Sequence, residues 1–124
     1  MTTPRVQDED PARLIVACLC AEWCSSCREY RATFDDVAKE FAGMHFVWVD
    51  VEDDAALVDG IDVDNFPTLF IASPRGAQFF GALTPQRDIL VRLVQAHAGE
   101  ASDNRLQVAA LDALLARLRA LAEA

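Results

Sequence analysis

All four cysteines of the chain lie within one ten-residue segment, at Cys18, Cys20, Cys24 and Cys27. Structural disulfides in small secreted domains join cysteines that are spread along the chain, because a bridge stabilises most when it closes a long loop. A cluster this tight cannot form such a framework. It indicates redox chemistry or a metal site, and it requires a fold that brings the thiols together.

The composition is that of one ordinary globular domain. The chain has 124 residues, of which 52% are hydrophobic and 25% are charged, so there is room for one hydrophobic core. The formal net charge is -9, and the surplus acid lies largely between Asp50 and Asp64. Because phosphate groups are bound by Lys and Arg, we expect no nucleic-acid partner and no membrane partner. The surplus of acidic residues either keeps the protein soluble or selects its partners.

The first residues do not look like a targeting signal. Residues 1–12 are polar and contain two prolines, which indicates a loosely ordered lead-in without the apolar core of a secretory signal. No apolar run approaches the ~20 residues that span a bilayer. We therefore expect a cytoplasmic protein. Of the 11 Lys and Arg residues all but one are Arg, and Ala is abundant, which is typical of a GC-rich bacterial genome.

Apolar runs and helical periodicity alternate along the chain. Leu14–Cys20 is a continuous apolar run, the pattern of a strand buried on both faces. The predicted elements are a strand at 14–20, a helix from Cys24 that Gly43 ends, a strand at 45–51, a short helix at 53–59, strands at 67–72 and 77–82, a helix that starts at Thr84 and Pro85, and a helix at 103–123. Parallel strands need helical crossovers, whereas 67–72 and 77–82 are joined by a short turn. We therefore expect an α/β fold with a mixed four-stranded sheet and helices on both faces.

The last predicted helix has an apolar stripe that something must cover. The stripe consists of Leu111, Leu114, Leu118 and Leu121, with Leu115 and Ala122 beside it. Its spacing is that of an amphipathic helix. Either the rest of the chain or a second copy covers it, so we expect a monomer or a weak homodimer through this helix. The predicted boundaries are 1–12 for the lead-in, 13–99 for the main domain and 100–124 for the C-terminal helix.

Cys24 and Cys27 have the spacing of a dithiol at the start of a helix. Residues three apart on the first turn lie on one face, so their sulfurs can reach bonding distance. Cys24 falls at the helix N-terminus, where unpaired N–H groups and the helix dipole favour a thiolate. This arrangement predicts that Cys24 attacks a substrate disulfide and that Cys27 resolves the mixed disulfide. Half of a zinc site has the same spacing, so a metal site stays open.

Two segments resemble the active site of the thioredoxin family. One is Ala21–Cys27 (AEWCSSC), which follows a buried strand, and the other is Phe66-Pro67-Thr68, at the start of a later strand. The resemblance covers about Leu14 to His97. It implies a thioredoxin-like fold in which the family's first strand and helix are reduced or absent and the C-terminal helix is extra.

The resemblance also implies roles for residues around the cysteines. In the family, the proline that corresponds to Pro67 is cis and faces the disulfide, and the backbone of the residue before it, here Phe66, pairs with the substrate chain. Trp23 corresponds to an exposed contact residue, and Gly81 resembles the glycine beside the active-site rim. We therefore expect Trp23, Phe66, Pro67 and Gly81 to bind substrate.

The chain departs from the family pattern at the site itself. Ser25-Ser26 replaces the Gly-Pro between the family's cysteines, so the reduction potential should differ. Cys18 aligns with the buried aspartate that helps to move the proton of the resolving cysteine, and Trp48 aligns with the lysine often found beneath it. Neither can act as a carboxylate base. Deprotonation of Cys27 must then depend on water, on Glu22 or on another thiolate, and we predict slow resolution.

Cys18 and Cys20 form an additional pair. Alternation along a strand puts both side chains on one face, and in the aspartate's place Cys18 lies beneath Cys27. Three interpretations stay open. The two are small buried hydrophobic residues, or they supply a second redox couple or an alternative resolving thiol, or they contribute to a shared metal site.

Together these features predict an enzyme, a thioredoxin-like oxidoreductase that reduces protein disulfides. No cofactor is needed, since the sulfurs themselves carry two electrons. The expected partners are a disulfide-bearing protein substrate and an upstream thiol reductant. The alternatives are a thioredoxin-shaped binding module without turnover and a four-cysteine metal-binding or redox-sensing protein.

Overall fold

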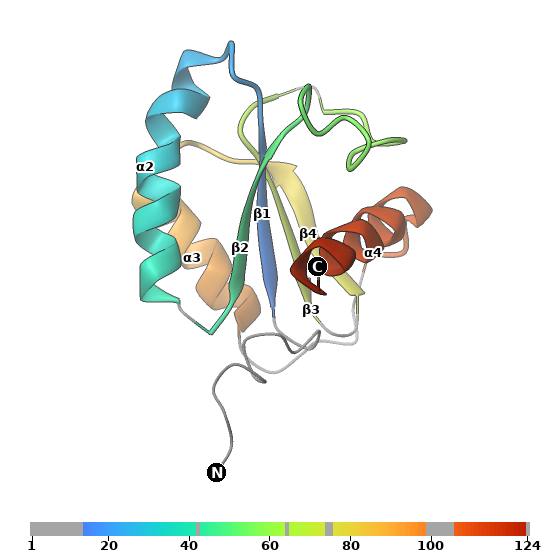
Figure 1. The fold of residues 1–124 in the computed structure, drawn as a ribbon. Coiled ribbons are helices and arrows are strands. Elements are labelled where there is room, and N and C mark those ends of the chain that lie inside the picture. The colour runs from blue at the N-terminus through green and yellow to red at the C-terminus, as the bar shows by residue number, and fades with distance from the viewer. Residues whose placement is uncertain (1–13, 42, 64, 74–75, 99–105, 124) are drawn as a thin grey trace.

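A four-stranded mixed sheet forms the centre of the molecule (Figure 1). The computed structural model describes residues 14–41, 43–63, 65–73, 76–98 and 106–123. The strands are β1 (Ile15–Cys20), β2 (His45–Asp50), β3 (Thr68–Ser73) and β4 (Gly76–Ala82), in the order β2-β1-β3-β4. β1 is parallel to β2 and antiparallel to β3, which is antiparallel to β4. The predicted mixed sheet is confirmed. The lead-in at 1–12, and with it any reduced first strand and helix, lies outside the described residues.

β1 is buried along its whole length because both faces of the sheet are covered. Ile15, Ala17 and Leu19 pack into the hydrophobic core on one face. Val16, Cys18 and Cys20 pack into the core on the other. The alternation of side chains along a strand explains this division, and it accounts for the continuous apolar run in the sequence. Cys18 and Cys20 share a face, as predicted.

Helices α2 (Ser25–Glu40) and α3 (Arg87–Ala98) cover the face that carries these cysteines (Figure 1). The buried residues of α2 follow helical spacing and are Cys27, Tyr30, Phe34 and Val37. Two predicted helix ends are wrong. Phe41, rather than Gly43, is the C-cap of α2. α3 begins at Arg87 rather than at Pro85, because the Gln86 N–H turns back to the Thr84 carbonyl, 2.7 Å away.

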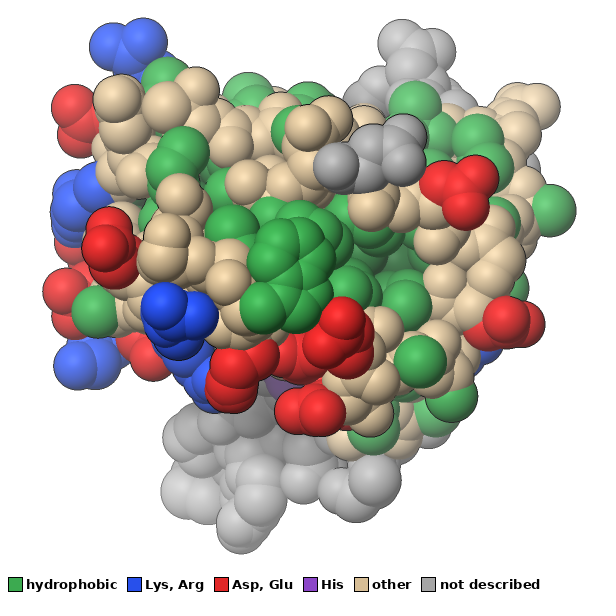
Figure 2. Space-filling view, turned by 90° about the horizontal axis from the view of Figure 1, so that it is seen from above, with side chains coloured by type: hydrophobic (Ala, Val, Ile, Leu, Met, Phe, Trp, Pro, Cys, Tyr) green, Lys and Arg blue, Asp and Glu red, His purple; other side chains and the backbone are tan. Residues whose placement is uncertain are grey.

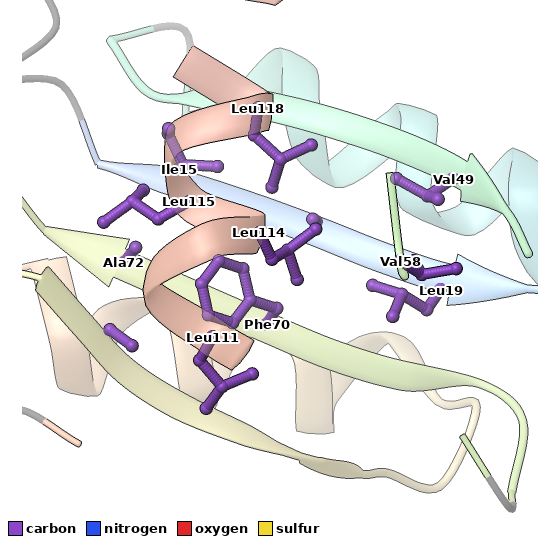
Figure 3. Packing of buried hydrophobic residues seen from close by; sticks show 12 residues of the cluster. Ile15, Leu19, Val49, Val58, Phe70, Ala72, Leu111, Leu114, Leu115 and Leu118 are labelled. Carbon is purple, nitrogen blue, oxygen red and sulfur yellow. The ribbon is translucent and has the colours of Figure 1, made fainter. Parts of the chain in front are cut away.

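Helix α4 (Ala109–Glu123) covers the opposite face of the sheet (Figure 1). Figure 3 shows the leucines of its stripe against side chains of β1 and β3. Leu111, Leu114, Leu115 and Leu118 are buried, whereas Leu121 is 50% exposed. The chain's own sheet thus covers most of the stripe. The predicted helix at 103–123 begins too early. The start at Asp103 lies outside the described residues, but residues 106–108 are not helical and α4 begins at Ala109. The Leu106 N–H donates to the Ala77 carbonyl of β4 at 2.8 Å instead.

The predicted short helix at 53–59 is wrong. Residues 51–60 form a series of turns instead. The Asp50 carboxylate accepts the N–H groups of Glu52 and Asp53, at 2.9 Å each, and such local bonds compete with helix formation. The segment is held by α4, where Arg117 donates to the carbonyls of Leu57 and Asp59 at 3.0 and 3.1 Å. None of the helices in the described part of the chain is long and apolar enough to cross a membrane.

Candidate active site

The two cysteines of the motif lie where β1 gives way to α2. Cys24 is the N-cap residue, with extended backbone angles. Its N–H donates to the Ala21 carbonyl at 3.0 Å, and its own carbonyl accepts from Arg28 at 3.2 Å. Cys24 is half-buried, whereas Cys27 is only 1% exposed. The structure therefore places one thiol at the surface and the other in the core, although both belong to one helical turn.

The surroundings of Cys24 favour its thiolate. The backbone N–H of Cys27 has the largest effect and lowers the pKa of the Cys24 thiol from its ordinary value. Desolvation opposes this, while the Cys27 side chain, the N–H of Ser26 and the charge of Arg28 lower the pKa further. N–H groups that point at a helix N-terminus stabilise negative charge there. Cys24 thus becomes ionised more readily than a free cysteine.

The surroundings of Cys27 favour its protonated form. Burial is the largest cause and raises the pKa of the Cys27 thiol well above the ordinary range, and a hydrogen bond with Cys20 acts in the same direction. An apolar environment penalises the charged form of any acid. The two thiols of the motif are therefore unequal, since Cys24 loses its proton first.

Trp23 forms an exposed aromatic surface beside Cys24. Its side chain is 63% exposed, and its ring meets Phe66 edge to face, with centroids 5.5 Å apart. The indole N–H donates to Glu52 at 3.0 Å. Figure 2 views the molecule from this end and shows hydrophobic side chains near the centre of the face, with a group of Asp and Glu side chains directly below them in the view. Glu52 was missed by the sequence analysis, because the contact joins residues 29 apart that meet only through the pairing of β1 with β2.

The Trp23–Phe66 contact also brings the loop before β3 against the cysteine turn. The Phe66–Pro67 peptide bond is cis, the isomer that the resemblance implies, and Pro67 is buried. The Pro67 carbonyl accepts the Leu83 N–H at 3.2 Å. Gly81 lies on β4 opposite Leu69. A Cβ added at Gly81 would meet only the Phe79 ring, at 3.5 Å, so the space there does not demand glycine.

Cys18 and Cys20 lie in the same hydrophobic cluster as Cys27. Both are buried, and their sulfurs are 3.7 Å apart. The side chain of Cys20 also raises the pKa of the Cys27 thiol. The pKa of the Cys20 thiol is raised far above the ordinary range. The hydrogen bond with Cys18 is the largest cause, and burial is the next. All four cysteines are free thiols. Among the described residues, no group of three or more His, Cys, Asp or Glu side chains is arranged to hold a metal ion.

The sequence matches a family model in a region that contains all of these residues. The model for thioredoxin matches residues 4–96, three quarters of the chain. The chain belongs to the thioredoxin family. Among curated relatives, H-type thioredoxins from Picea mariana and Oryza sativa subsp. indica are 31% and 26% identical to it. These matches cover 75% and 73% of this chain and 74% of each relative.

Solved structures of thioredoxins share the fold. The germline-specific thioredoxin Deadhead of Drosophila melanogaster has a TM-score of 0.63 at 21% identity, with 75% of this chain and 88% of that one covered. The thioredoxin of Fasciola hepatica has a TM-score of 0.60 at 24% identity, with 76% and 89% covered. Helix α4 lies beyond the residues that the thioredoxin model matches.

This thioredoxin-family chain has an open pocket beside its buried motif thiol. The pocket has a volume of about 290 Å³ and is lined by Ala21, Glu22, Cys27, Arg28, Arg31, Trp48, Asp50, Asp53 and Asp54. Trp48, at the position of the family's lysine, has the Arg31 guanidinium 5.3 Å from its ring centroid. The backbone N–H groups of Asp53 and Glu52 lower the pKa of Asp50, which makes that carboxylate a weak base. Glu22, Asp50, Asp53 and Asp54 are the carboxylates that line this pocket together with Cys27.

Proposed function

We propose that the chain is an enzyme that reduces disulfides of proteins with Cys24 as the nucleophile and Cys27 as the resolving thiol. The observation that carries this proposal is the inequality of the two thiols. Cys24 is accessible at a helix N-terminus with a lowered pKa, and Cys27 is buried in the next turn with a raised one. A reactive thiolate next to a protonated partner is what disulfide exchange requires.

The reaction has two exchange steps. The Cys24 thiolate attacks one sulfur of the substrate disulfide, so a mixed disulfide forms and the first substrate thiolate leaves. Cys27 then loses its proton and attacks Cys24. The mixed disulfide breaks, the second substrate thiol is released, and a Cys24–Cys27 disulfide remains. Two electrons have passed from the enzyme's thiols to the substrate, and no cofactor takes part.

The second step should be slow, because nothing in the described structure beside Cys27 is a strong base. Cys18 stands in place of the family's buried aspartate, and it is fully buried. The pocket gives water access to the edge of Cys27. Proton loss from Cys27 then proceeds through this water or through Glu22, without a dedicated carboxylate.

The substrate approaches over Trp23 and the loop at Phe66. These two side chains are in contact and lie beside Cys24, so they offer an apolar platform to the chain that carries the disulfide. The backbone of Phe66 pairs with that chain, while Pro67 and Gly81 border the platform. In a reducing compartment an upstream thiol reductant returns the Cys24–Cys27 disulfide to two thiols.

Insulin reduction in the presence of dithiothreitol tests this function. The wild-type chain should accelerate precipitation of the reduced insulin B chain, and Cys24→Ser should bring the rate down to that of dithiothreitol alone. Cys18→Ala is the matched control, because it removes a thiol from the same region and should retain the acceleration. Equal rates for the wild-type chain and Cys24→Ser, both folded, would instead indicate a binding module without turnover.

A further inference from the structure

The proposed exchange uses two of four thiols, and the other two lie in the same buried cluster as Cys27. The Cys18 and Cys20 sulfurs are 3.7 Å apart, and the side chains of Cys20 and Cys27 each affect the pKa of the other. Cys27 in turn interacts with Cys24. Cys18, Cys20 and Cys27 are each at most 1% exposed. The buried end of the dithiol therefore has a third sulfur within reach.

Backbone geometry favours one of the two inner contacts as a covalent bond. Cys18 and Cys20 lie two residues apart in one strand, so their Cα atoms are about 6.6 Å apart, near the upper limit of about 6.8 Å for a disulfide. β1 is paired on both sides, which prevents the backbone from closing that distance. Cys20 is instead the last residue of β1, and Cys27 lies in the first turns of α2. These two belong to different elements, so their Cα–Cα separation is not fixed by the rise of a single strand.

We propose that Cys20 is a third redox thiol, which attacks Cys27 in the Cys24–Cys27 disulfide and moves the disulfide into the interior. This inference rests on the proposed function, which supplies the Cys24–Cys27 disulfide by oxidation with a substrate disulfide. The Cys24–Cys27 bond breaks, the Cys20–Cys27 bond forms, and the proton of Cys20 ends on Cys24 or in water. No electrons are gained or lost in this step.

The product differs from the Cys24–Cys27 disulfide in the identity of the free thiol. Cys24 becomes a free thiol again, and the disulfide now joins two buried cysteines, Cys20 and Cys27. The lowered pKa of Cys24 makes it the better leaving group, and the raised pKa of Cys20 makes the attack slow. The inner disulfide thus accumulates when the upstream reductant is scarce and the oxidised enzyme persists.

Disulfide mapping in Cys24→Ser tests this proposal. The folded variant is oxidised with diamide, its free thiols are alkylated after denaturation, and the monomer is cleaved after Arg and Glu. Cleavage after Arg13, Glu22 and Arg28 separates Cys18 and Cys20, on peptide 14–22, from Cys27, on peptide 23–28. We expect the two peptides to be linked from Cys20 to Cys27, with the alkyl group on Cys18. Circular dichroism establishes that the variant is folded.

Two matched substitutions separate the inner thiols. Added to Cys24→Ser, Cys20→Ala should abolish the linked peptides, whereas Cys18→Ala, the same change on the same strand face, should leave them. A bond from Cys18 to Cys20, a bond from Cys18 to Cys27, or fully alkylated thiols in the folded variant would each overturn the proposal.

The wild-type chain gives a second measurement that does not depend on Cys24→Ser. After oxidation and a long incubation without reductant, part of Cys24 should become open to alkylation under native conditions, and Cys20→Ala should reduce that fraction several-fold. Equal fractions in both chains overturn the inference alone if insulin reduction is intact. Loss of insulin reduction in the wild-type chain would count against the proposed function instead.

Discussion

Cys24 and Cys27 have opposite properties because of where they fall in one helical turn. The first is the N-cap residue and faces the free N–H groups of α2. The second is turned into the core between α2 and the sheet. The two-residue spacing of Ser25-Ser26 is thus sufficient to give one thiol access to solvent and to deny it to the other.

The titration of Cys24 follows from this position. The helix N-terminus lowers the pKa of Cys24. The rate of its alkylation by iodoacetamide should therefore reach half of its maximum at a lower pH than for a free cysteine, whose pKa is about 8.5. Arg28→Gln should move the midpoint upward, since the Arg28 charge favours the thiolate. Arg31→Gln is the control, because its guanidinium lies over Trp48. A midpoint at or above that of free cysteine would contradict the assignment of Cys24 as nucleophile.

The pH dependence of resolution reports on Cys27. Its pKa is raised, so across the neutral range its thiolate fraction grows about tenfold per pH unit. The substrate is an aromatic disulfide whose two thiolates absorb light. Attack by Cys24 releases the first thiolate, and attack by Cys27 releases the second. The rate of the second phase should rise steeply with pH, and Cys27→Ser should lack it. A second phase that does not change with pH would show that another group resolves the mixed disulfide.

At the scale of elements, α4 is an addition to the region that the thioredoxin model matches. It packs Leu111, Leu114, Leu115 and Leu118 onto the face of the sheet opposite to the cysteines (Figure 3). Burial of each leucine side chain contributes about 1.5–3 kcal/mol. The helix therefore stabilises β1, the strand that leads into the active-site turn, through the face of the sheet opposite to the cysteines.

Two leucines of α4 make a matched test of this packing. Leu114 is fully buried and Leu121 is half exposed. Leu114→Ala should lower the free energy of unfolding by about 2–5 kcal/mol, and Leu121→Ala by about 1 kcal/mol or less. Urea denaturation with an unchanged slope measures both. If the two substitutions cost the same, α4 does not pack on the sheet as described.

Periodicity predicted the regular elements, whereas local hydrogen bonds decided the places where the prediction was wrong. The apolar run of β1 and the helical spacing of α2 each have one dominant pattern, so the sheet and its covering helices could be predicted. The segment at 53–59 has helical composition, but the Asp50 carboxylate captures its first N–H groups. Thr84 resembles an N-cap, but a tight turn at Gln86 delays the helix. Such competition between bonds of similar energy leaves no trace in periodicity.

The same distinction applies to the site. Cys24 and Cys27 are neighbours in the sequence, so their spacing was sufficient to place them on one helical turn. The resemblance supplied the loop at Pro67. Glu52, by contrast, reaches Trp23 because the parallel strands β1 and β2 end side by side, with Cys20 opposite Asp50. Arg31 joins the pocket from α2, one helical turn after Arg28, where its guanidinium lies over the Trp48 ring.

At the scale of the whole molecule, the charge is strongly negative. The formal net charge is -9, and carboxylates border the apolar platform, with Glu52 bonded to Trp23 and Asp50, Asp53 and Asp54 around the pocket. A field of one sign attracts partners of the other sign and repels its own. The approach of a substrate should therefore depend on its charge.

Matched disulfide peptides with flanking Lys or flanking Glu test this dependence. At low ionic strength the Lys peptide should be reduced several-fold faster than the Glu peptide, and high salt should bring the two rates together, because salt screens exposed charges over about 10 Å or less. Glu52→Gln should narrow the gap at low salt while leaving the aromatic platform in place. Equal rates at low salt would show that the acid has no influence on the encounter.

Trapping of a mixed disulfide tests the roles of the two motif cysteines most directly. Reduced Cys27→Ser and Cys24→Ser are each mixed with a disulfide-bearing peptide, quenched with acid and mapped by mass spectrometry. Cys27→Ser should retain one peptide on Cys24, Cys24→Ser should retain almost none over the same time, and the wild-type chain should carry an internal disulfide and no peptide. A folded Cys27→Ser that forms no adduct, or one that carries the peptide on Cys18 or Cys20, would contradict the assignment of Cys24 as the attacking thiol.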